Sequence, residues 1–277
     1  MQNPYAHIEQ LLDGGDVSEI SKSRMIHQNQ YAHLDGDGGF SALGVNDSVD
    51  EKRLSLREIE ELARKVHKAL WESRDKFNLK LSPVDLLDPQ TAAKHLGFDL
   101  DYVDSLGFYA DRSEKIVVSG LIDRSNRSIQ VSRELDPRVQ RFTAAHEIGH
   151  AILHKHMSLV HRDRPMDGTR IERDQLEYEA DKFATYFLMP ANLLRTEFET
   201  RFLMSPFVLD EATSFALFND SLVDTIKTYS GQRGRRKLAR FLASAMQYNG
   251  NHFYSLAEYF KVSIETMAIR LEELNLV

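Results

Sequence analysis

The chain has 277 residues, 42% of them hydrophobic, and its 42 acidic and 35 basic residues give a formal net charge of −7. This length allows one large domain or two modest ones around a buried core. The negative charge argues against a protein that binds polyanions over its whole surface, although a local basic patch could still contact nucleic acid. There are no cysteines, which excludes disulfides and thiolate metal sites and fits a reducing compartment.

The first 50 residues differ in composition from the rest of the chain. They contain Asp13-Gly-Gly-Asp16 and Asp35-Gly-Asp-Gly-Gly39 among scattered polar residues, a composition typical of a disordered tail. The N-terminus lacks the basic start and apolar run of a signal peptide, and no stretch reaches the roughly 20 apolar residues of a membrane helix. We therefore expect a cytoplasmic protein with a tail at 1–50, a main domain at 51–200 and a helical C-terminal region at 201–277.

After the tail, helical patterns precede extended ones. Apolar residues recur at helical spacing from Ser55, where Ser55 and Glu58 predict a capping box. Two short helices are expected next, beginning at Ser82-Pro83 and Asp88-Pro89, and Gly97 should end the second. Short β-branched and aromatic runs then predict an antiparallel sheet of three or four strands, at residues 98–103, 107–110, 116–122 and 128–132. Without a long crossover between them, a doubly wound parallel sheet is not expected.

The next helix carries the pattern that points most directly to function. Asp136-Pro137 predicts its start, with the aspartate as N-cap and the proline at the first helical position. On this helix His146-Glu147-Ile148-Gly149-His150 spells HExxH. Two histidines one turn apart can face one metal ion, and Glu147 points to the same opening. The flanking residues are uncharged, as expected for a ligand helix buried under a cleft.

A catalytic zinc ion has three protein ligands and keeps one position for water, so a third ligand is needed. Histidines on three successive turns would span about 11 Å, too far for His154 to join the first two at one ion. His156 has the spacing of the extended metzincin motif, but Leu153 replaces the glycine of that motif. We expect His154 and His156 to lie on the surface or behind the ligands.

The helix predicted at about residues 171–190 offers a better third ligand. Glu177 and Asp181 lie four residues apart on one face, in the form ExxxD. Glu177 is the predicted ligand, and Asp181 could accept a hydrogen bond from the outer nitrogen of a ligand histidine. Glu179 remains a less favoured alternative ligand, because it lies about 200° around the helix from Glu177.

This residue set predicts peptide hydrolysis. Glu147 would act as general base on a water activated by Zn²⁺, with Mn²⁺ as a second possible metal, and would pass the proton to the leaving amine. A residue that stabilises the oxyanion is also expected. The sequence leaves five candidates for it open: Tyr109, Tyr178, Tyr186, His161 and Arg162.

The segments Thr143–His154 and Glu177–Pro190 resemble the ImmA/IrrE group of bacterial and phage metallopeptidases. The second is similar to that group's signature E-x-E-A-x-x-F-A-x-x-L-M-P, and the resemblance covers roughly residues 55–195. It implies an α+β, mostly helical, zincin-like domain of the gluzincin type. It also implies zinc held by His146, His150 and Glu177, with Glu147 as general base. The implied role is regulatory: cleavage of a helix-turn-helix repressor that controls stress, prophage or mobile-element genes.

A second hypothesis is a DNA-binding or adaptor protein whose metal site is structural or vestigial. Its support is a helix-turn-helix-like pattern at residues 255–274 and one basic cluster, made of Arg233, Arg235, Arg236, Lys237 and Arg240. Such runs are more often solvated helix faces. A structural zinc site needs no general base, so Glu147 favours the protease. A broadly degradative peptidase is a third, weaker hypothesis.

Overall fold

The structure is a computed structural model that describes residues 53–74, 82–111, 114–154, 160–162, 175–218 and 221–277. The predicted tail at residues 1–50 and the side chain of His156 lie outside these ranges. Within them the fold is α+β and mostly helical, so the predicted fold class is confirmed. None of the described helices is long and apolar enough to cross a lipid bilayer.

The first helices begin and end at the predicted signals. Helix α3 (Leu56–Glu72) starts at the expected capping box, in which Ser55 and Glu58 each accept a hydrogen bond from the other's backbone N–H. A 3₁₀ helix, η2 (Pro83–Leu87), and α4 (Pro89–Leu96) follow. Gly97 ends α4 in the left-handed conformation, at φ 76°, which glycine adopts without steric cost.

The main sheet has four strands in the order β1 (Asp99–Val103), β5 (Ser128–Ser132), β4 (Gly120–Asp123) and β6 (Val160–Arg162). Strand β4 pairs antiparallel with β5 and β6, as predicted, but β1 pairs parallel with β5. The sheet is therefore mixed, and a purely antiparallel sheet was the wrong prediction. The reason lies in the connection: the chain leaves β1 and returns through the β4–β5 hairpin, which brings β5 back in the direction of β1.

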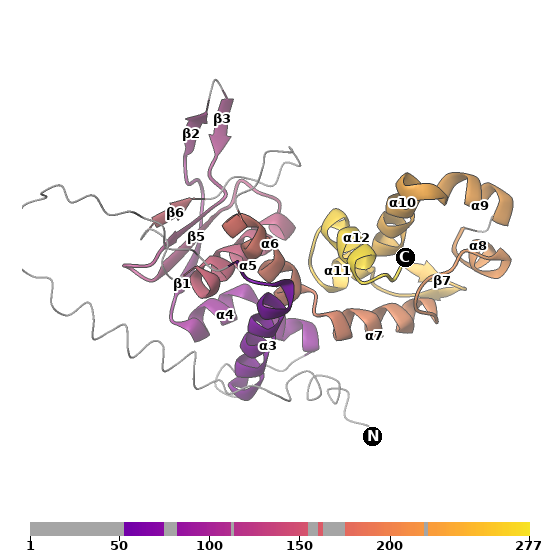
Figure 1. Cartoon of the computed structure of the whole chain (residues 1–277), viewed down its shortest axis with the longest axis horizontal. Coiled ribbons are helices and arrows are strands. Elements are labelled where there is room, and N and C mark those ends of the chain that lie inside the picture. The colour runs from indigo at the N-terminus through magenta and orange to yellow at the C-terminus, as the bar shows by residue number, and fades with distance from the viewer. Residues whose placement is uncertain (1–52, 75–81, 112–113, 155–159, 163–174, 219–220) are drawn as a thin grey trace, which may run out of the picture.

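A second hairpin, β2 (Phe108–Asp111) and β3 (Glu114–Val117), extends away from the main sheet (Figure 1). The single strand predicted at residues 116–122 is divided between β3 and β4, because the chain passes from this hairpin into the sheet at residues 118–119. Strand β6 was missed: it lies between the HExxH helix and the helix predicted at about residues 171–190, where no strand was expected.

Helix α5 (Pro137–Leu153) forms the centre of the sheet-containing part. The side chain of Asp136 caps it by accepting a hydrogen bond from the N–H of Arg138 at 2.9 Å. All nine residues from Phe142 to His150 are buried, because the helix is enclosed by strands β4 and β5, helix α4 and helix α6 (Gln175–Leu188). Helix α6 in turn packs on α3.

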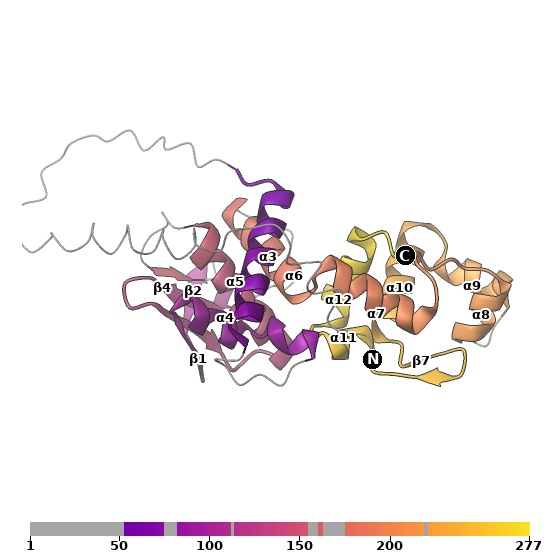
Figure 2. The ribbon, with the colours of Figure 1, turned by 90° about the horizontal axis from the view of Figure 1, so that it is seen from below.

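The C-terminal elements gather to one side of the sheet-containing part, and α7 connects the two (Figures 1 and 2). Phe198, Phe202, Phe207 and Tyr248 form an aromatic cluster in this region. The C-terminal region consists of α7 (Ala191–Phe202), α8 (Glu211–Phe218), α9 (Leu222–Tyr229), α10 (Gly231–Ser244), the hairpin β7 (Gln247–Tyr248) and β8 (Asn251–His252), α11 (Leu256–Tyr259) and α12 (Ile264–Glu273).

Candidate metal centre

Helices α5 and α6 bring three potential metal ligands together. The Nε2 atoms of His146 and His150 lie 3.0 Å apart. Glu177 reaches both, with one carboxylate oxygen 3.4 Å from Nε2 of His146 and the other 3.4 Å from Nε2 of His150. The donor atoms all lie within 4.8 Å of one another. The two histidines are buried, whereas the Glu177 side chain is 27% exposed, so the glutamate lies on the more open side of the group.

A close helix crossing makes this convergence possible. A Cβ atom on Gly149 would lie 3.2 Å from the Cα and carbonyl oxygen of Ala180, and 3.3 Å from Cβ of Phe183. These contacts are tight, so the absence of a side chain on Gly149 allows α5 and α6 to approach one another closely at this point. Because Ala180 is about one turn from Glu177, the crossing brings Glu177 within reach of His150.

Asp181 contacts the outer nitrogen of His146. The sequence predicted this role for Asp181 without indicating which histidine it would contact. Nδ1 of His146 lies 2.9 Å from Oδ1 of Asp181. A carboxylate only accepts hydrogen bonds, so Nδ1–H donates, and the Nε2 atom of a neutral His146 then carries a lone pair. That lone pair faces the other two donors.

Glu147 is fully buried on the same helix, beside the backbone of strand β4. A Cβ atom on Gly120 would come within 2.2 Å of Oε1 of Glu147 and within 2.8 Å of Cγ2 of Thr143. Arg124, just beyond β4, donates a hydrogen bond of 2.9 Å to the carbonyl oxygen of His150. Burial lowers the pKa of Arg124, and the negative charge of Glu147 opposes this lowering. Sequence reasoning missed Gly120 and Arg124, because only the tertiary fold brings β4 beside α5.

His154 and Glu179 lie behind the donor group. His154 is buried, with Nδ1 at 2.9 Å from Nδ1 of His150 and Nε2 at 3.3 Å from Oε2 of Glu179. Glu179 is 3% exposed and lies outside the group of convergent donors. Its carboxylate points to His154.

The five candidates for oxyanion stabilisation are not equally placed. Tyr186 packs under the guanidinium of Arg270, at 4.7 Å from the ring centroid, and burial raises the pKa of Tyr186 to about 12. Tyr186 is nine residues after Glu177 and so lies on the opposite side of α6. Tyr178 is 36% exposed and lies below the ammonium group of Lys182. The side chains of the other three, Tyr109, His161 and Arg162, lie outside the described residues.

The donor set fits a zinc ion. Ligands at about 2.1 Å in a tetrahedral arrangement lie about 3.4 Å from one another, close to the observed separations of 3.0 and 3.4 Å. Two imidazoles and one carboxylate suit zinc and are also compatible with manganese. Three protein donors leave a fourth position for water, which is the usual arrangement of a catalytic site rather than of a structural one.

Two histidines and a carboxylate from two helices, with a glutamate between the histidines, define the class of metal-dependent hydrolases that activate water. Comparison with known families agrees: residues 100–204 match the family model of the IrrE N-terminal-like domain, Peptidase_M78. The resemblance to the ImmA/IrrE metallopeptidases is thereby confirmed for this part of the chain, and the match supports a peptidase. The search of curated proteins found no match to the chain.

Proposed function

We propose that the protein is a cytoplasmic zinc endopeptidase that cleaves a regulatory protein, and that this substrate is a helix-turn-helix repressor of stress, prophage or mobile-element genes. The observation that carries the proposal is the convergence of His146, His150 and Glu177 within 4.8 Å, with Glu147 on the same helix as the histidines. The family match supports the peptidase activity. The choice of a repressor as substrate rests on the resemblance to ImmA/IrrE proteins.

In this proposal each residue has a defined task. His146, His150 and Glu177 would hold the metal, which when bound supplies an acidified water and a polarised carbonyl. Glu147 accepts the proton of the attacking water and delivers it to the leaving amine. Gly120 leaves the space that the Glu147 carboxylate occupies. Asp181 fixes the ring of His146 through the contact at Nδ1.

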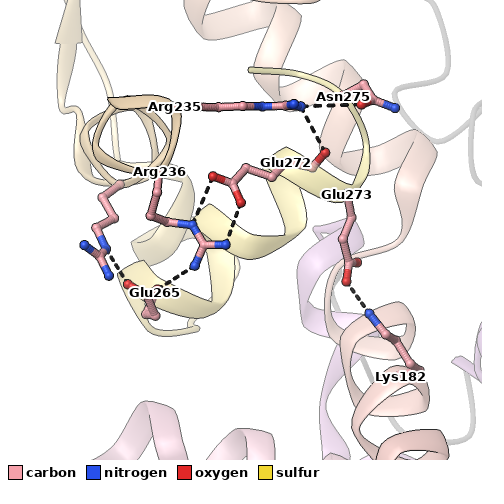
Figure 3. A network of polar contacts seen from close by, with 8 residues as sticks. Lys182, Arg235, Arg236, Glu265, Glu272, Glu273 and Asn275 are labelled. Carbon is pink, nitrogen blue, oxygen red and sulfur yellow. Dashed lines mark hydrogen bonds and ion pairs between the residues drawn. The ribbon is translucent and has the colours of Figure 1, made fainter. Parts of the chain in front are cut away.

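The alternative, a DNA-binding protein that uses the basic cluster, receives less support from the contacts of that cluster. Arg236 contacts Glu265 at 2.8 Å and Glu272 at 2.5 Å (Figure 3). Arg240 contacts Glu265 at 2.5 Å. Arg235 lies 3.4 Å from Oδ1 of Asn275 (Figure 3). Part of the positive charge is therefore neutralised within the chain, and fewer cations remain for phosphate contacts.

Co-expression of the protein with candidate repressors tests the proposed activity. Wild type should yield two repressor fragments and derepress a reporter gene, whereas Glu147→Gln should yield intact repressor and no derepression. Glu147→Gln keeps the size of the side chain and all three proposed ligands, so loss of cleavage reports on the base. Equal derepression by both variants without any fragment would contradict the protease and favour an adaptor.

A further inference from the structure

A buried row of side chains extends from the donor group to the interior: His150, His154 and Glu179. The ring nitrogens Nδ1 of His150 and Nδ1 of His154 lie 2.9 Å apart, and Nε2 of His154 lies 3.3 Å from Oε2 of Glu179. All three residues are buried, with exposed fractions of 0%, 5% and 3%. Of the two proposed histidine ligands, His150 contacts this row, whereas the outer nitrogen of His146 contacts Asp181.

The far end of the row is fixed by donors. Oε1 of Glu179 accepts a hydrogen bond from the backbone N–H of Leu54 at 3.2 Å and one from the amide of Gln175 at 2.7 Å. A carboxylate has no proton to give, so Nε2 of His154 must donate to Oε2 of Glu179. Leu54 directly precedes the capping box of α3, so the anchor of the row connects α3 with α6.

The protons along the row follow from this anchor. A neutral imidazole with its proton on Nε2 has a lone pair on Nδ1, so Nδ1 of His154 accepts. Nδ1 of His150 must then donate to it, and Nε2 of His150 carries no proton. A metal-binding histidine needs this tautomer, because the metal takes the lone pair of the unprotonated nitrogen.

We propose that His154 and Glu179 are positioning residues that hold His150 in its Nδ1–H tautomer and direct the Nε2 lone pair toward the metal. The inference rests on the proposed zinc site and deepens it. His146 depends on a carboxylate in direct contact, whereas His150 depends on a carboxylate one imidazole further away. Neither His154 nor Glu179 is a ligand in this arrangement.

Zinc affinity, measured by competition with a chromophoric chelator, tests the proposal without any peptide substrate. His154→Leu replaces the imidazole with an apolar side chain of similar size and so removes both hydrogen bonds. It should weaken zinc binding by about 10- to 100-fold. His154→Gln can accept from His150 through its amide oxygen and donate to Glu179 through its amide nitrogen. It should therefore recover part of the affinity that His154→Leu loses.

The same variants distinguish failure of this inference from failure of the proposed function. If wild type binds zinc and His154→Leu binds it equally well, the positioning role is wrong and the proposed protease stands. If His154→Leu and His154→Gln lose the same affinity, the effect is one of packing, and the positioning role is again wrong. If wild type binds no zinc, both proposals fall.

A spectroscopic measurement on wild type covers the case in which the variants do not fold. In the zinc-loaded protein, long-range ¹H–¹⁵N correlations of the histidine rings should show His154 as the Nε2–H tautomer and His150 with its proton on Nδ1. A proton on Nδ1 of His154, in either a neutral or a doubly protonated ring, would overturn the proposal.

Discussion

Gly120 determines how much space the side chain of Glu147 has. Any larger residue at this position would place Cβ at 2.2 Å from Oε1 of Glu147. The carboxylate would have to move, and its burial leaves little room. The identity of residue 120 is therefore coupled to the position of the proposed base, although the two residues lie on different elements.

The substitution Gly120→Ala should lower kcat/KM for peptide cleavage by about 100-fold, because a displacement of about 1 Å in a catalytic group has effects of this size. Zinc content should not change, since the atoms nearest to a Cβ on residue 120 belong to Glu147 and Thr143 and not to the three proposed ligands. Ser119→Ala adds no atom to the neighbouring position and serves as the matched control. Wild-type activity in Gly120→Ala would show that Glu147 does not need its present position.

His67 gives the fold a specific sensitivity to acid. Its Nε2 lies 2.9 Å from the carbonyl oxygen of Phe187, and its ring stacks on Phe187 with centroids 5.2 Å apart. Burial is the main cause that lowers the pKa of His67, from 6.5 to about 4. Between these two values the unfolded chain binds a proton that the folded chain does not, so the free energy of unfolding falls as pH falls.

Protonation of His67 should lower the free energy of unfolding by about 3 kcal/mol between pH 7 and pH 4. Above pH 7 this group should not change the stability. Urea unfolding at pH 7, 5.5 and 4 measures the loss, with His67→Phe as the comparison. Because the variant has no titrating ring, its stability should decline less steeply than that of wild type. Parallel declines would mean that His67 takes up its proton in the folded state as readily as in the unfolded one.

At the scale of elements, the crossing of α5 and α6 assembles the candidate site. Each helix contributes only part of the donor set, and Gly149 sets their separation. Larger residues at position 149 should push α6 outward and move Glu177 away from the two histidines.

A series of substitutions of increasing size at position 149 measures how zinc affinity depends on the separation of α5 and α6. Gly149→Ala should weaken zinc binding by about tenfold, similar to the loss of an outer contact, and Gly149→Val should weaken it further. Circular dichroism establishes whether each variant is folded. A folded Gly149→Val with wild-type zinc affinity would show that the helix separation does not control the site.

The sequence predicted well those features that depend on neighbouring residues. The starts of α3 and α5 followed from Ser55 and Asp136, and the end of α4 followed from Gly97, because caps act within one turn. The parallel pairing of β1 with β5 could not be predicted in this way. Strand direction depends on residues far apart in the chain, and the alternation of side chains is the same in both directions.

In the candidate site too, features within one helix could be predicted, whereas contacts between elements could not. HExxH and ExxxD each lie within one helix, so their spacing could be recognised. The contact between His154 and Glu179 and the approach of Gly120 to Glu147 join different elements, and no spacing rule predicts them. For this reason the sequence predicted His154 on the surface or behind the ligands and Glu179 as a less favoured ligand, without a contact between the two.

At the scale of the whole molecule, α12 packs against the end of α6, the helix that carries Glu177. Arg270 is 3% exposed, donates a hydrogen bond of 3.2 Å to the carbonyl oxygen of Met189 and lies above the ring of Tyr186. Glu273 forms an ion pair with Lys182 of α6 (Figure 3). The C-terminal helices thus stabilise the position of the helix that supplies the third proposed ligand.

Arg270→Leu should lower the free energy of unfolding by about 3 kcal/mol, because it leaves the buried partners of the guanidinium without their charge and hydrogen bond. Chemical denaturation measures the loss. Arg240→Leu is the matched control. Arg270 lies 3.2 Å from Glu273 and Arg240 is likewise paired with a glutamate, but Arg240 is exposed, and exposed ion pairs contribute little. Equal losses for the two variants would contradict a special role for the contact between α12 and α6.

The central claim is that one metal ion joins His146, His150 and Glu177, and the metal content of purified protein tests it most directly. After dialysis against zinc and removal of excess metal, elemental analysis should find one zinc per chain in wild type and in Glu147→Gln. Glu177→Ala should lose most of its zinc in the same treatment, because loss of a ligand weakens binding more than loss of an outer contact, which costs about 10- to 100-fold in affinity. Full zinc content in Glu177→Ala, or none in wild type, would contradict the account.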